Sequence, residues 1–440
     1  MSAPDNVSLI CNVTIIDPEA GAAIPAQDIV ISGGRIELLR DTHPAQDPSA
    51  IDGTGLFAIP GLIDTHVHAL GIYSEQNPGL FDMGWIRRQQ EKNFAAFLRS
   101  GVTTVRDLGA PLGMIKGFAK RARAWDILAP RILFSGPIIS TAGGYPDFTA
   151  ETPWLVEAMT GPLRVDLRSR AHARRTVRSL ARAGVHCIKV MYQSVRYDNE
   201  HTALPVPPLD FIRALVDAAH AHNLPVAAHC CYSFDLEKLL DAPIDSWEHL
   251  SIDAPLSANV VRRVADKGVS VTTTLMTYGI LDHHARLDQH RRAHRYDFEP
   301  KPRRLLRRAC LAMASGDYDL GYVGSDAVET GSRHMRHNLA LLQEAGVPIS
   351  YGTDSGGAIT PCGCPHWEFS DMKCAGMSNA QALRAATTTA ATVLRRPDLG
   401  RIAQGATADI LLLKGNPLDD IENITQVAAV IRDGRLAVSN

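Results

Sequence analysis

Two histidines one residue apart, His66 and His68, stand in the segment GLIDTHVHAL, directly after a Pro-Gly pair. On a β-strand, side chains two residues apart point to the same face. The two imidazoles would therefore enter one small volume, where neutral histidines can bind a divalent metal ion. The alternative is a pair of ordinary histidines on a half-buried strand, and the His-x-His motif taken alone favours that alternative.

Further residues that ligate metals or carry protons stand at the ends of other short apolar segments. Lys189 lies in CIKVMY, His229 near the end of VAAHC, His249 near the end of SWEHL and Asp354 in SYGTDSGG. Lysine is the unusual member, because an ammonium group has no lone pair to give a metal. For Lys189 the alternative is a structural lysine whose stem lies along apolar surface.

The middle of the chain alternates short apolar strands with helical stretches, such as residues 210–223 and 379–396. Eight such strands favour an α/β fold, a (β/α)8 TIM-type barrel, over an open doubly wound sheet. Reactive groups in such barrels lie at the carboxyl ends of the strands, where the residues above would meet. The expected strands are residues 62–69, 102–109, 131–137, 187–192, 225–230, 246–250, 269–275 and 348–354.

The two ends of the chain have a different character from the middle. Residues 1–60 and residues 409–436 read as short strands broken by Gly and Pro, with tight turns at SGGR and DGR. We expect both termini to pair in one small β-sandwich domain, since chain ends often lie close together. The predicted boundaries are 1–60 and 403–440 for this composite domain and 61–402 for the barrel.

Composition excludes several classes of protein. The chain has 440 residues, of which 45% are hydrophobic and 21% charged, as in an ordinary globular enzyme. A net charge of -2 gives no reason to expect a nucleic acid or a membrane surface as a partner. The start of the chain lacks a secretory pattern, and the 8 cysteines are scattered, so we expect a cytoplasmic protein with reduced thiols.

Four conspicuous segments receive the plainer interpretation. Cys230-Cys231 and Cys362-Gly-Cys364 lack a second ligand pair at zinc-finger spacing, so we expect loop thiols. The Arg-rich residues 164–184 fit a solvated helix face. Residues 283–308, rich in His and Arg, are expected to form a surface helix and loop.

The set and order of these residues resemble the amidohydrolase superfamily of metal-dependent hydrolases. PGLIDTHVH, GVTTVRDLG, YGTDSG and the tail from ALRAATTTAATVLRR through GRIAQGATADILLLKGNPLDDI all resemble it, so the resemblance covers almost the whole chain. It implies a first divalent metal held by His66, His68 and Asp354, and a second held by His229 and His249. Zinc is the first candidate, with cobalt, manganese or iron as alternatives.

In the binuclear branch of the superfamily, the lysine that Lys189 matches is carboxylated with CO2, and its carbamate bridges the two metals. Two metals would then lower the pKa of the water between them, and the bridging hydroxide would attack a carbonyl. Asp354 would act as general base and then as general acid toward the leaving amine. The resemblance thus implies an enzyme that hydrolyses amide-type C–N bonds.

Mononuclear deaminases of the superfamily lack this lysine, and the nucleobase examples carry Glu three residues after the fifth-strand His, where this chain has Tyr232. The sequence is most similar to those of prolidase-like dipeptidases and N-acyl-amino-acid hydrolases, and also to those of imidazolonepropionase-like proteins. It departs from them after the lysine, with IKVMYQSVRYDN, and after the third strand, with TAGGYPDF. Xenobiotic ureas, carbamates or anilides are therefore the alternative substrates. A mononuclear cyclic-amide hydrolase or deaminase is less favoured.

Residues just past strand ends are candidates for the substrate pocket: Tyr145, Tyr192, Arg196, Tyr232 and Tyr278. An arginine such as Arg196 can pair with a substrate carboxylate through two hydrogen bonds. A structural scaffold that has lost its ligands is disfavoured because all six positions are filled. A metal-binding sensor without turnover is disfavoured by the aspartate at the position of the base. The expected partner is a small-molecule substrate, and the resemblance implies a homo-oligomer.

Overall fold

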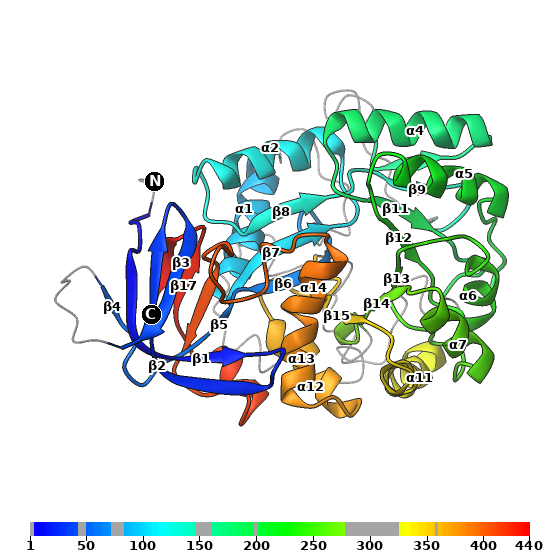
Figure 1. Ribbon diagram of the computed structural model, residues 1–440. Coiled ribbons are helices and arrows are strands. Elements are labelled where there is room, and N and C mark those ends of the chain that lie inside the picture. The colour runs from blue at the N-terminus through cyan, green and yellow to red at the C-terminus, as the bar shows by residue number, and fades with distance from the viewer. Residues whose placement is uncertain are drawn as a thin grey trace.

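A computed structural model gives the structure of the protein (Figure 1). The structure describes residues 4–42, 50–71, 83–146, 161–197, 201–277, 325–356 and 360–440. The segment 283–308, for which a surface helix and loop are expected, lies outside these residues. Among the described residues, no helix combines the length and the apolar character needed to cross a lipid bilayer.

Strands from both ends of the chain form one 8-stranded sheet. Figure 1 shows the blue N-terminal strands beside the red C-terminal strands, with both chain ends on this side of the molecule. The order is β18-β17-β16-β5-β1-β2-β3, with β4 paired to β1. The strands are β1 (Leu9–Asp17), β2 (Ala22–Ser32), β3 (Arg35–Asp41), β4 (Ile51–Asp52), β5 (Phe57–Pro60), β16 (Ile410–Leu413), β17 (Val427–Arg432) and β18 (Arg435–Ser439).

The turns of this sheet follow from the sequence. Gly33 and Gly34 join β2 to β3 with positive φ angles, and Asp433-Gly434 joins β17 to β18 in the same way. Such angles suit Gly, and Asp tolerates them. The contact between chain ends passes through β5 and β16, which pair antiparallel from Phe57–Leu413 to Pro60–Ile410. The sandwich form and the boundaries 1–60, 61–402 and 403–440 stay predictions.

Parallel strands fill the middle of the chain, and each of the eight predicted strand segments contains one. A 3-stranded sheet has the order β6-β7-β8, and a 7-stranded sheet has the order β10-β9-β11-β12-β13-β14-β15. The strands are β6 (Leu62–Val67), β7 (Val102–Asp107), β8 (Arg131–Phe134), β9 (Ile138–Ser140), β10 (Arg164–Asp166), β11 (Ile188–Met191), β12 (Val226–His229), β13 (Ser246–Glu248), β14 (Ser270–Thr272) and β15 (Ile349–Ser350).

Backbone hydrogen bonds connect both edges of the three-stranded sheet to the seven-stranded sheet. Thr65 N donates to Tyr351 O over 3.1 Å, which ties β6 to the chain after β15. His186 N donates to Phe134 O over 2.9 Å, which ties the end of β8 to the chain before β11. The fold is therefore mixed α/β with parallel sheets in contact, and the closed (β/α)8 barrel stays a prediction that these contacts favour.

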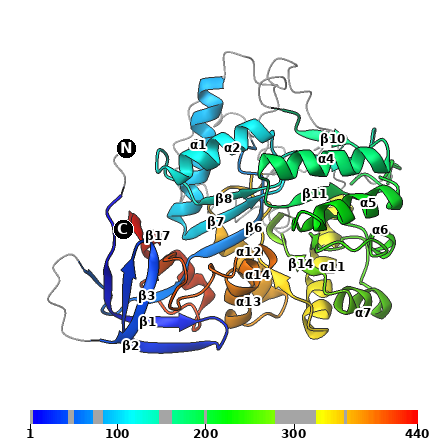
Figure 2. The same ribbon diagram turned by 45° about the horizontal axis from the view of Figure 1, so that its top comes forward.

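Helices lie on the outside of the parallel strands, as Figure 2 shows for α4, α5, α6 and α7. They bury an apolar stripe against the sheets because they are amphipathic. The helices are α1 (Met83–Arg99), α2 (Leu112–Arg123), α4 (Arg170–Ala183), α5 (Leu209–His220), α6 (Ser233–Leu239), α7 (Ala258–Asp266), α11 (Ser325–Glu344), α12 (Pro365–Cys374), α13 (Asn379–Ala385) and α14 (Thr388–Val393), with a 3-10 turn η2 (Ile421–Thr425).

Two helical predictions are refined by the structure. The single helix expected over residues 379–396 is two helices, because Thr387 leaves the helical conformation and its hydroxyl donates to the Leu383 carbonyl over 2.6 Å. In the segment 164–184, the first residues form β10 instead of helix. The helix begins only after Ser169, whose side chain caps it by accepting from His172 N.

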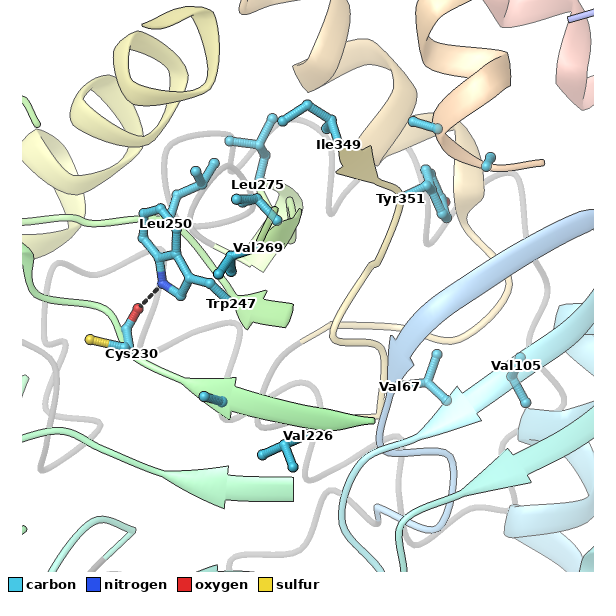
Figure 3. Close-up of a cluster of buried hydrophobic side chains, with 14 of the residues drawn as sticks. Val67, Val105, Val226, Cys230, Trp247, Leu250, Val269, Leu275, Ile349 and Tyr351 are labelled. Atoms are coloured by element: carbon cyan, nitrogen blue, oxygen red, sulfur yellow. Dashed lines mark hydrogen bonds between the residues drawn. The ribbon is translucent and has the colours of Figure 1, made fainter. Parts of the chain in front are cut away.

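Apolar side chains of the parallel strands and of the helices around them make one continuous core. Strands of a parallel sheet are covered on both faces, so β6 and β7 are buried at every residue. Figure 3 shows the part of the core around Trp247 of β13. Its indole Nε1 donates to the Cys230 carbonyl over 2.6 Å, which satisfies a buried donor.

An ion-pair cluster around the buried Asp409 carboxylate connects the terminal sheet to the parallel strands. The guanidinium of Arg131, at the start of β8, donates to the carboxylates of Asp409 and Asp433 beside β16 and β17, and to the Thr104 hydroxyl over 2.9 Å. Asp409 is 4% exposed. Its charge therefore depends on Arg131 for compensation.

We predict that Arg131→Met lowers the free energy of unfolding by about 3–5 kcal/mol, because it leaves the buried Asp409 carboxylate unpaired. Urea unfolding measures the change. The control is Arg263→Met, which removes a partner of Asp241, a carboxylate that is 54% exposed, and should cost about 0–1 kcal/mol. Equal losses in the two variants would contradict the structural role given to Arg131.

Candidate active site

His66, His68 and Asp354 form one group of potential ligands at the carboxyl ends of β6 and β15. Asp354 Oδ1 lies 3.5 Å from His66 Nε2 and 3.3 Å from His68 Nε2. One donor atom from each of the three side chains lies within 4.8 Å of the others. A cluster of two imidazoles and a carboxylate at this spacing can hold a divalent metal ion.

Backbone pairing brings these three residues together. Asp354 N donates to His66 O over 2.8 Å, and His68 N donates to Ser355 O over 2.7 Å. Gly356 makes the approach possible, since a Cβ atom there would lie 2.1 Å from His68 O. Gly356 also has a φ of 81°, a conformation that favours glycine. The GTDSGG segment thus encodes a close contact with the His-x-His strand.

His229, Cys231 and His249 form a second group at the ends of β12 and β13. One donor atom from each lies within 4.8 Å of the others, and all three side chains are buried. The His249 ring connects the two groups, because its centroid lies 4.6 Å from those of both His66 and His229. The two groups therefore form one continuous polar cluster.

Lys189 of β11 completes the set. Its side chain is 1% exposed, and its Nζ has no hydrogen-bond partner among the described residues. It interacts electrostatically with Glu248 and Asp354. A buried amine without a hydrogen-bond partner costs free energy. A bound group that contacts this nitrogen would remove that cost.

The cluster is held in states suited to binding a cation. Burial lowers the pKa of His66, His229 and His249 well below the ordinary value, and that of His68 to about 4. All four imidazoles are therefore neutral at neutral pH, as metal ligation requires.

The lysine and the carboxyl group of the cluster are shifted as well. Burial lowers the pKa of Lys189 to about 8 and raises that of Asp354 to about 7. Both groups can therefore exchange protons near neutral pH, which is a property of catalytic sites.

A buried carboxylate orients His66. Glu248 Oε2 accepts from His66 Nδ1 over 2.8 Å, and Oε1 accepts from Arg106 over 2.8 Å and from the Ser246 hydroxyl over 2.5 Å. Although burial raises the pKa of Glu248, Arg106 and Lys189 hold it below its ordinary value. Because an ionised carboxylate only accepts, Nδ1 carries the hydrogen and Nε2 keeps a lone pair that faces Asp354.

The His249 ring is fixed in a comparable way. The Thr274 hydroxyl lies 2.8 Å from His249 Nδ1. His249, Thr274 and Asp354 have φ angles of 74°, 49° and 53°, which non-glycine residues rarely adopt. Strained backbone of this kind clusters at functional sites. Glu368 supports the chain after Thr274, since its carboxyl oxygens accept from the backbone of Leu275 and Met276 over 2.9 and 2.7 Å.

Aromatic side chains lie beside His229. Tyr145 stacks on its ring with centroids 4.7 Å apart, and Tyr197 contacts Tyr145 edge to face at 5.5 Å. Tyr232 is stacked 6.0 Å from Tyr197, and its hydroxyl donates to the Arg196 carbonyl over 2.9 Å. These residues form an apolar wall with hydroxyl groups next to the polar cluster.

The five candidate pocket residues thus have different places. Tyr145 contacts the cluster directly, and Tyr232 and Arg196 are connected to it through the aromatic wall. Strand alternation puts Tyr192 on the face of β11 opposite Lys189, and within the described chain its side chain makes no hydrogen bond or ring contact with the six predicted ligands. Tyr278 lies outside the described residues.

A family comparison agrees with these observations. The model of the amidohydrolase family matches residues 57–437, which is most of the chain. The chain belongs to the amidohydrolase family. It is accordingly an enzyme that acts on carbon–nitrogen bonds, and the predicted superfamily is confirmed.

Three relatives of this amidohydrolase show how widely the named activities of similar proteins vary. Ochratoxinase of Aspergillus niger is 24% identical over 394 residues, covering 84% of this chain and 73% of the relative. A prolidase solved with N-methylphosphonate-L-proline is 27% identical, with a TM-score of 0.76 and coverage of 98% and 99% of the two chains. Phenylurea hydrolase B is 21% identical, with a TM-score of 0.74 and coverage of 97% and 96%, a similarity that shows the shared fold.

Sequence reasoning misses several residues of this amidohydrolase site. Cys231 is expected to be a loop thiol, yet its side chain is 1% exposed and lies among the potential ligands. Glu248 directly precedes the predicted ligand His249 in the motif SWEHL. Cys231 stands two residues after the predicted ligand His229 in VAAHCC. Arg106 lies in GVTTVRDLG and Tyr197 in IKVMYQSVRYDN. Nothing in these segments places either residue beside the predicted ligands, and only the folded chain brings them to the site.

The buried Glu368 gives this amidohydrolase a specific pH dependence. Burial raises the pKa of this carboxyl from an ordinary value of 4.5 to about 8. Between these values the folded protein keeps a proton that the unfolded chain has released. Its contribution to folding stability is therefore complete below pH 4.5 and is lost as the pH rises through about 8.

We predict that Glu368→Gln flattens the fall in stability between pH 5 and 8 for metal-free protein, measured by urea unfolding at several pH values. The control is Glu344→Gln, at an exposed position near the end of α11, which should leave the profile unchanged. A Glu368→Gln profile parallel to that of the wild type would show that this carboxyl does not titrate as described.

Proposed function

We propose that the protein is a binuclear metal-dependent hydrolase that cleaves an amide-type C–N bond in a dipeptide or N-acyl amino acid. The observation that carries this proposal is the cluster of six side chains, with the buried Lys189 amine among them. Ordinary packing gives no reason to bury an amine without a hydrogen-bond partner beside four neutral imidazoles. A carbamate formed on this amine would be an anionic ligand for two divalent cations and would give such a reason.

The donor set fits two divalent ions. His66, His68 and Asp354 would hold one ion, and His229 and His249 the other. His66 Nε2 is buried and, like the Lys189 amine, has no hydrogen-bond partner within the described chain. Imidazole and carboxylate ligands suit zinc, and also cobalt, manganese or iron.

Lys189 would connect the two ions after carboxylation. An unprotonated amine can attack the carbon of CO2, and loss of one proton then leaves a carbamate with two oxygen donors. The lowered pKa of Lys189, about 8 because of burial, keeps part of the amine unprotonated near neutral pH. Carboxylation would also convert a cation beside two metal ions into an anion.

In the proposed reaction, the metal ions and Asp354 would have different roles. Bound divalent ions supply acidified water and polarise the scissile carbonyl. Asp354 accepts the proton of the attacking water and delivers it to the leaving nitrogen, so that the amine departs neutral.

The wall of Tyr145, Tyr197 and Tyr232 would receive an apolar part of the substrate, and Arg196 would pair with a substrate carboxylate. The prolidase relative supports a dipeptide or N-acyl amino acid. The relative named phenylurea hydrolase B supports the alternative, a xenobiotic urea, carbamate or anilide. A mononuclear cyclic-amide hydrolase or deaminase is less favoured because Lys189 would then have no role.

The proposal includes a closed (β/α)8 barrel, which would direct all six side chains to one end, and a β-sandwich made by both termini. It also includes a homo-oligomer that acts on a small molecule in the cytoplasm. The proposed metal site at the cluster of six side chains does not depend on these additional features.

The test is metal content and hydrolysis in protein grown with bicarbonate. We expect close to two metal ions per chain in the wild type and one or fewer in Lys189→Ala, because the connecting carbamate is lost. The control is Lys116→Ala, at an exposed position on α2. Hydrolysis of dipeptides and N-acyl amino acids, followed by amine release, should fall about 10²–10⁴-fold in Asp354→Asn.

One metal ion per chain that is unaffected by Lys189→Ala would contradict the binuclear site and favour ring hydrolysis or deamination. Two metal ions with turnover of ureas, carbamates or anilides only would keep the metal centre and replace the substrate class.

A further inference from the structure

Gln193 contacts the His229 ring in a way that the family resemblance does not imply. Its Oε1 lies 2.8 Å from His229 Nε2, and the residue is 1% exposed. It stands four residues after Lys189, in the segment IKVMYQSVRYDN, where this sequence departs from prolidase-like sequences. A buried amide from this chain's own pattern is thus in contact with a potential metal ligand.

The orientation of the Gln193 amide follows from its second hydrogen bond. Its Nε2 donates to the Val195 carbonyl over 2.8 Å. A rotated amide would place Oε1 against that carbonyl oxygen, where two acceptors repel each other. Oε1 therefore faces His229. Because an amide oxygen only accepts, the hydrogen between the two residues belongs to His229 Nε2.

Two other groups lie farther from the same ring nitrogen. The Tyr197 hydroxyl is 3.4 Å and the Cys231 Sγ 3.8 Å from His229 Nε2. The contact with Gln193 is the shortest of the three and has the length of an ordinary N–H···O hydrogen bond. A neutral imidazole carries one ring hydrogen, so a hydrogen on Nε2 leaves the lone pair on Nδ1.

The backbone on both sides holds Gln193 at this place. Tyr192 N donates to the His229 carbonyl over 3.0 Å, so the chain leaves β11 beside this ligand. The Ser194 backbone N and hydroxyl donate to the Asp235 carboxylate over 2.7 and 2.8 Å. Gln193 lies between these two anchors, and its short reach to the ring is therefore defined.

We propose that Gln193 is a positioning residue of the metal centre: it keeps the ring hydrogen of His229 on Nε2, so that His229 binds its metal ion through Nδ1. This inference rests on the proposed function, which supplies that ion. His66 is held in the opposite way, since Glu248 accepts from its Nδ1 and its Nε2 faces Asp354. The two metal positions thus receive these imidazoles through different ring nitrogens.

A fixed ring hydrogen raises metal affinity. Without an acceptor at Nε2, the His229 hydrogen could occupy either nitrogen and the ring could rotate, and metal binding would have to remove both freedoms. The accepting oxygen also makes the ligating nitrogen more basic. Tyr145 restricts the ring further, because it stacks on it with centroids 4.7 Å apart. Loss of such a hydrogen-bond partner weakens metal binding about 10–100-fold.

The experiment compares the wild type with Gln193→Met and Gln193→Glu. Met keeps the length of the side chain without an amide oxygen, whereas one carboxyl oxygen of Glu can still accept from His229 Nε2. Nitrogen NMR of the full-length chain labelled with ¹⁵N-histidine, before and after zinc loading, reports which ring nitrogen carries the hydrogen. His229→Asn assigns the signals. We expect the Nε2–H form in the wild type and Gln193→Glu, and a mixture of both forms in metal-free Gln193→Met.

Zinc affinity gives a second readout. We expect one of the two zinc ions to bind Gln193→Met about 10–100-fold more weakly than the wild type, and Gln193→Glu to restore most of this loss. The matched control is Ser194→Ala, which removes the hydroxyl bonds to Asp235 from the same segment. It should keep both the ring hydrogen and the zinc affinity. An unchanged His229 signal and unchanged zinc affinity in Gln193→Met overturn the inference.

A crystal structure of the zinc-loaded wild type requires no variant and decides the matter if Gln193→Met does not fold. We expect His229 Nδ1 at about 2.0–2.1 Å from a zinc ion, with Nε2 still beside Gln193. Zinc bound at Nε2 overturns the role of Gln193 and leaves the proposed function standing. The absence of a zinc ion beside His229 and His249 overturns both.

Discussion

The Glu248 carboxylate is the interaction on which the site depends. It lies at the end of β13 and accepts hydrogen bonds from Arg106 of β7 and His66 of β6, so it connects three strands through the protein interior. Arg106 also donates to the Thr65 carbonyl over 2.6 Å, which fixes the backbone next to His66. Loss of either charge would leave the other buried and unpaired, a cost of about 3–5 kcal/mol. The same contacts fix the tautomer of His66 and the direction of its free lone pair.

The cluster concentrates polar groups that the fold alone does not satisfy. His66 Nε2 and Lys189 Nζ are buried without hydrogen bonds within the described chain, and three nearby residues have unfavourable backbone conformations. These unsatisfied groups and backbone conformations lower the stability of the fold. They lie together at the carboxyl ends of the parallel strands. The continuous apolar core around β6 to β15 and the ion pairs of Arg131 maintain the fold despite this cost.

Much of this arrangement is readable from the sequence. Apolar runs that end in His, Lys or Asp predict both the strands and the ends at which the side chains meet, because parallel strands share a direction. The similar strand-rich character of the two ends predicts that they join in one sheet, but it does not predict that β5 pairs with β16. The family resemblance adds the role expected of Lys189, which residue chemistry alone does not suggest.

Other features depend on contacts between distant residues and escape such reasoning. The break between α13 and α14 lies at Thr387, whose backbone is not helical and whose hydroxyl donates to the Leu383 carbonyl of the preceding helix. Tyr197 follows β11 and His229 ends β12, yet the Tyr197 hydroxyl lies 3.4 Å from His229 Nε2 in the folded chain. Cys231 shares its motif with His229, but its burial among ligands depends on His249, which belongs to another strand.

The most direct measurement is an anomalous-difference map from crystals of the zinc-loaded protein at the zinc edge. We predict two peaks about 3.5–4 Å apart, one beside His66, His68 and Asp354 and one beside His229 and His249. The ordinary electron-density map of the same crystals should show a carboxylated Lys189 between them. A single peak, or peaks away from these side chains, would contradict the binuclear centre.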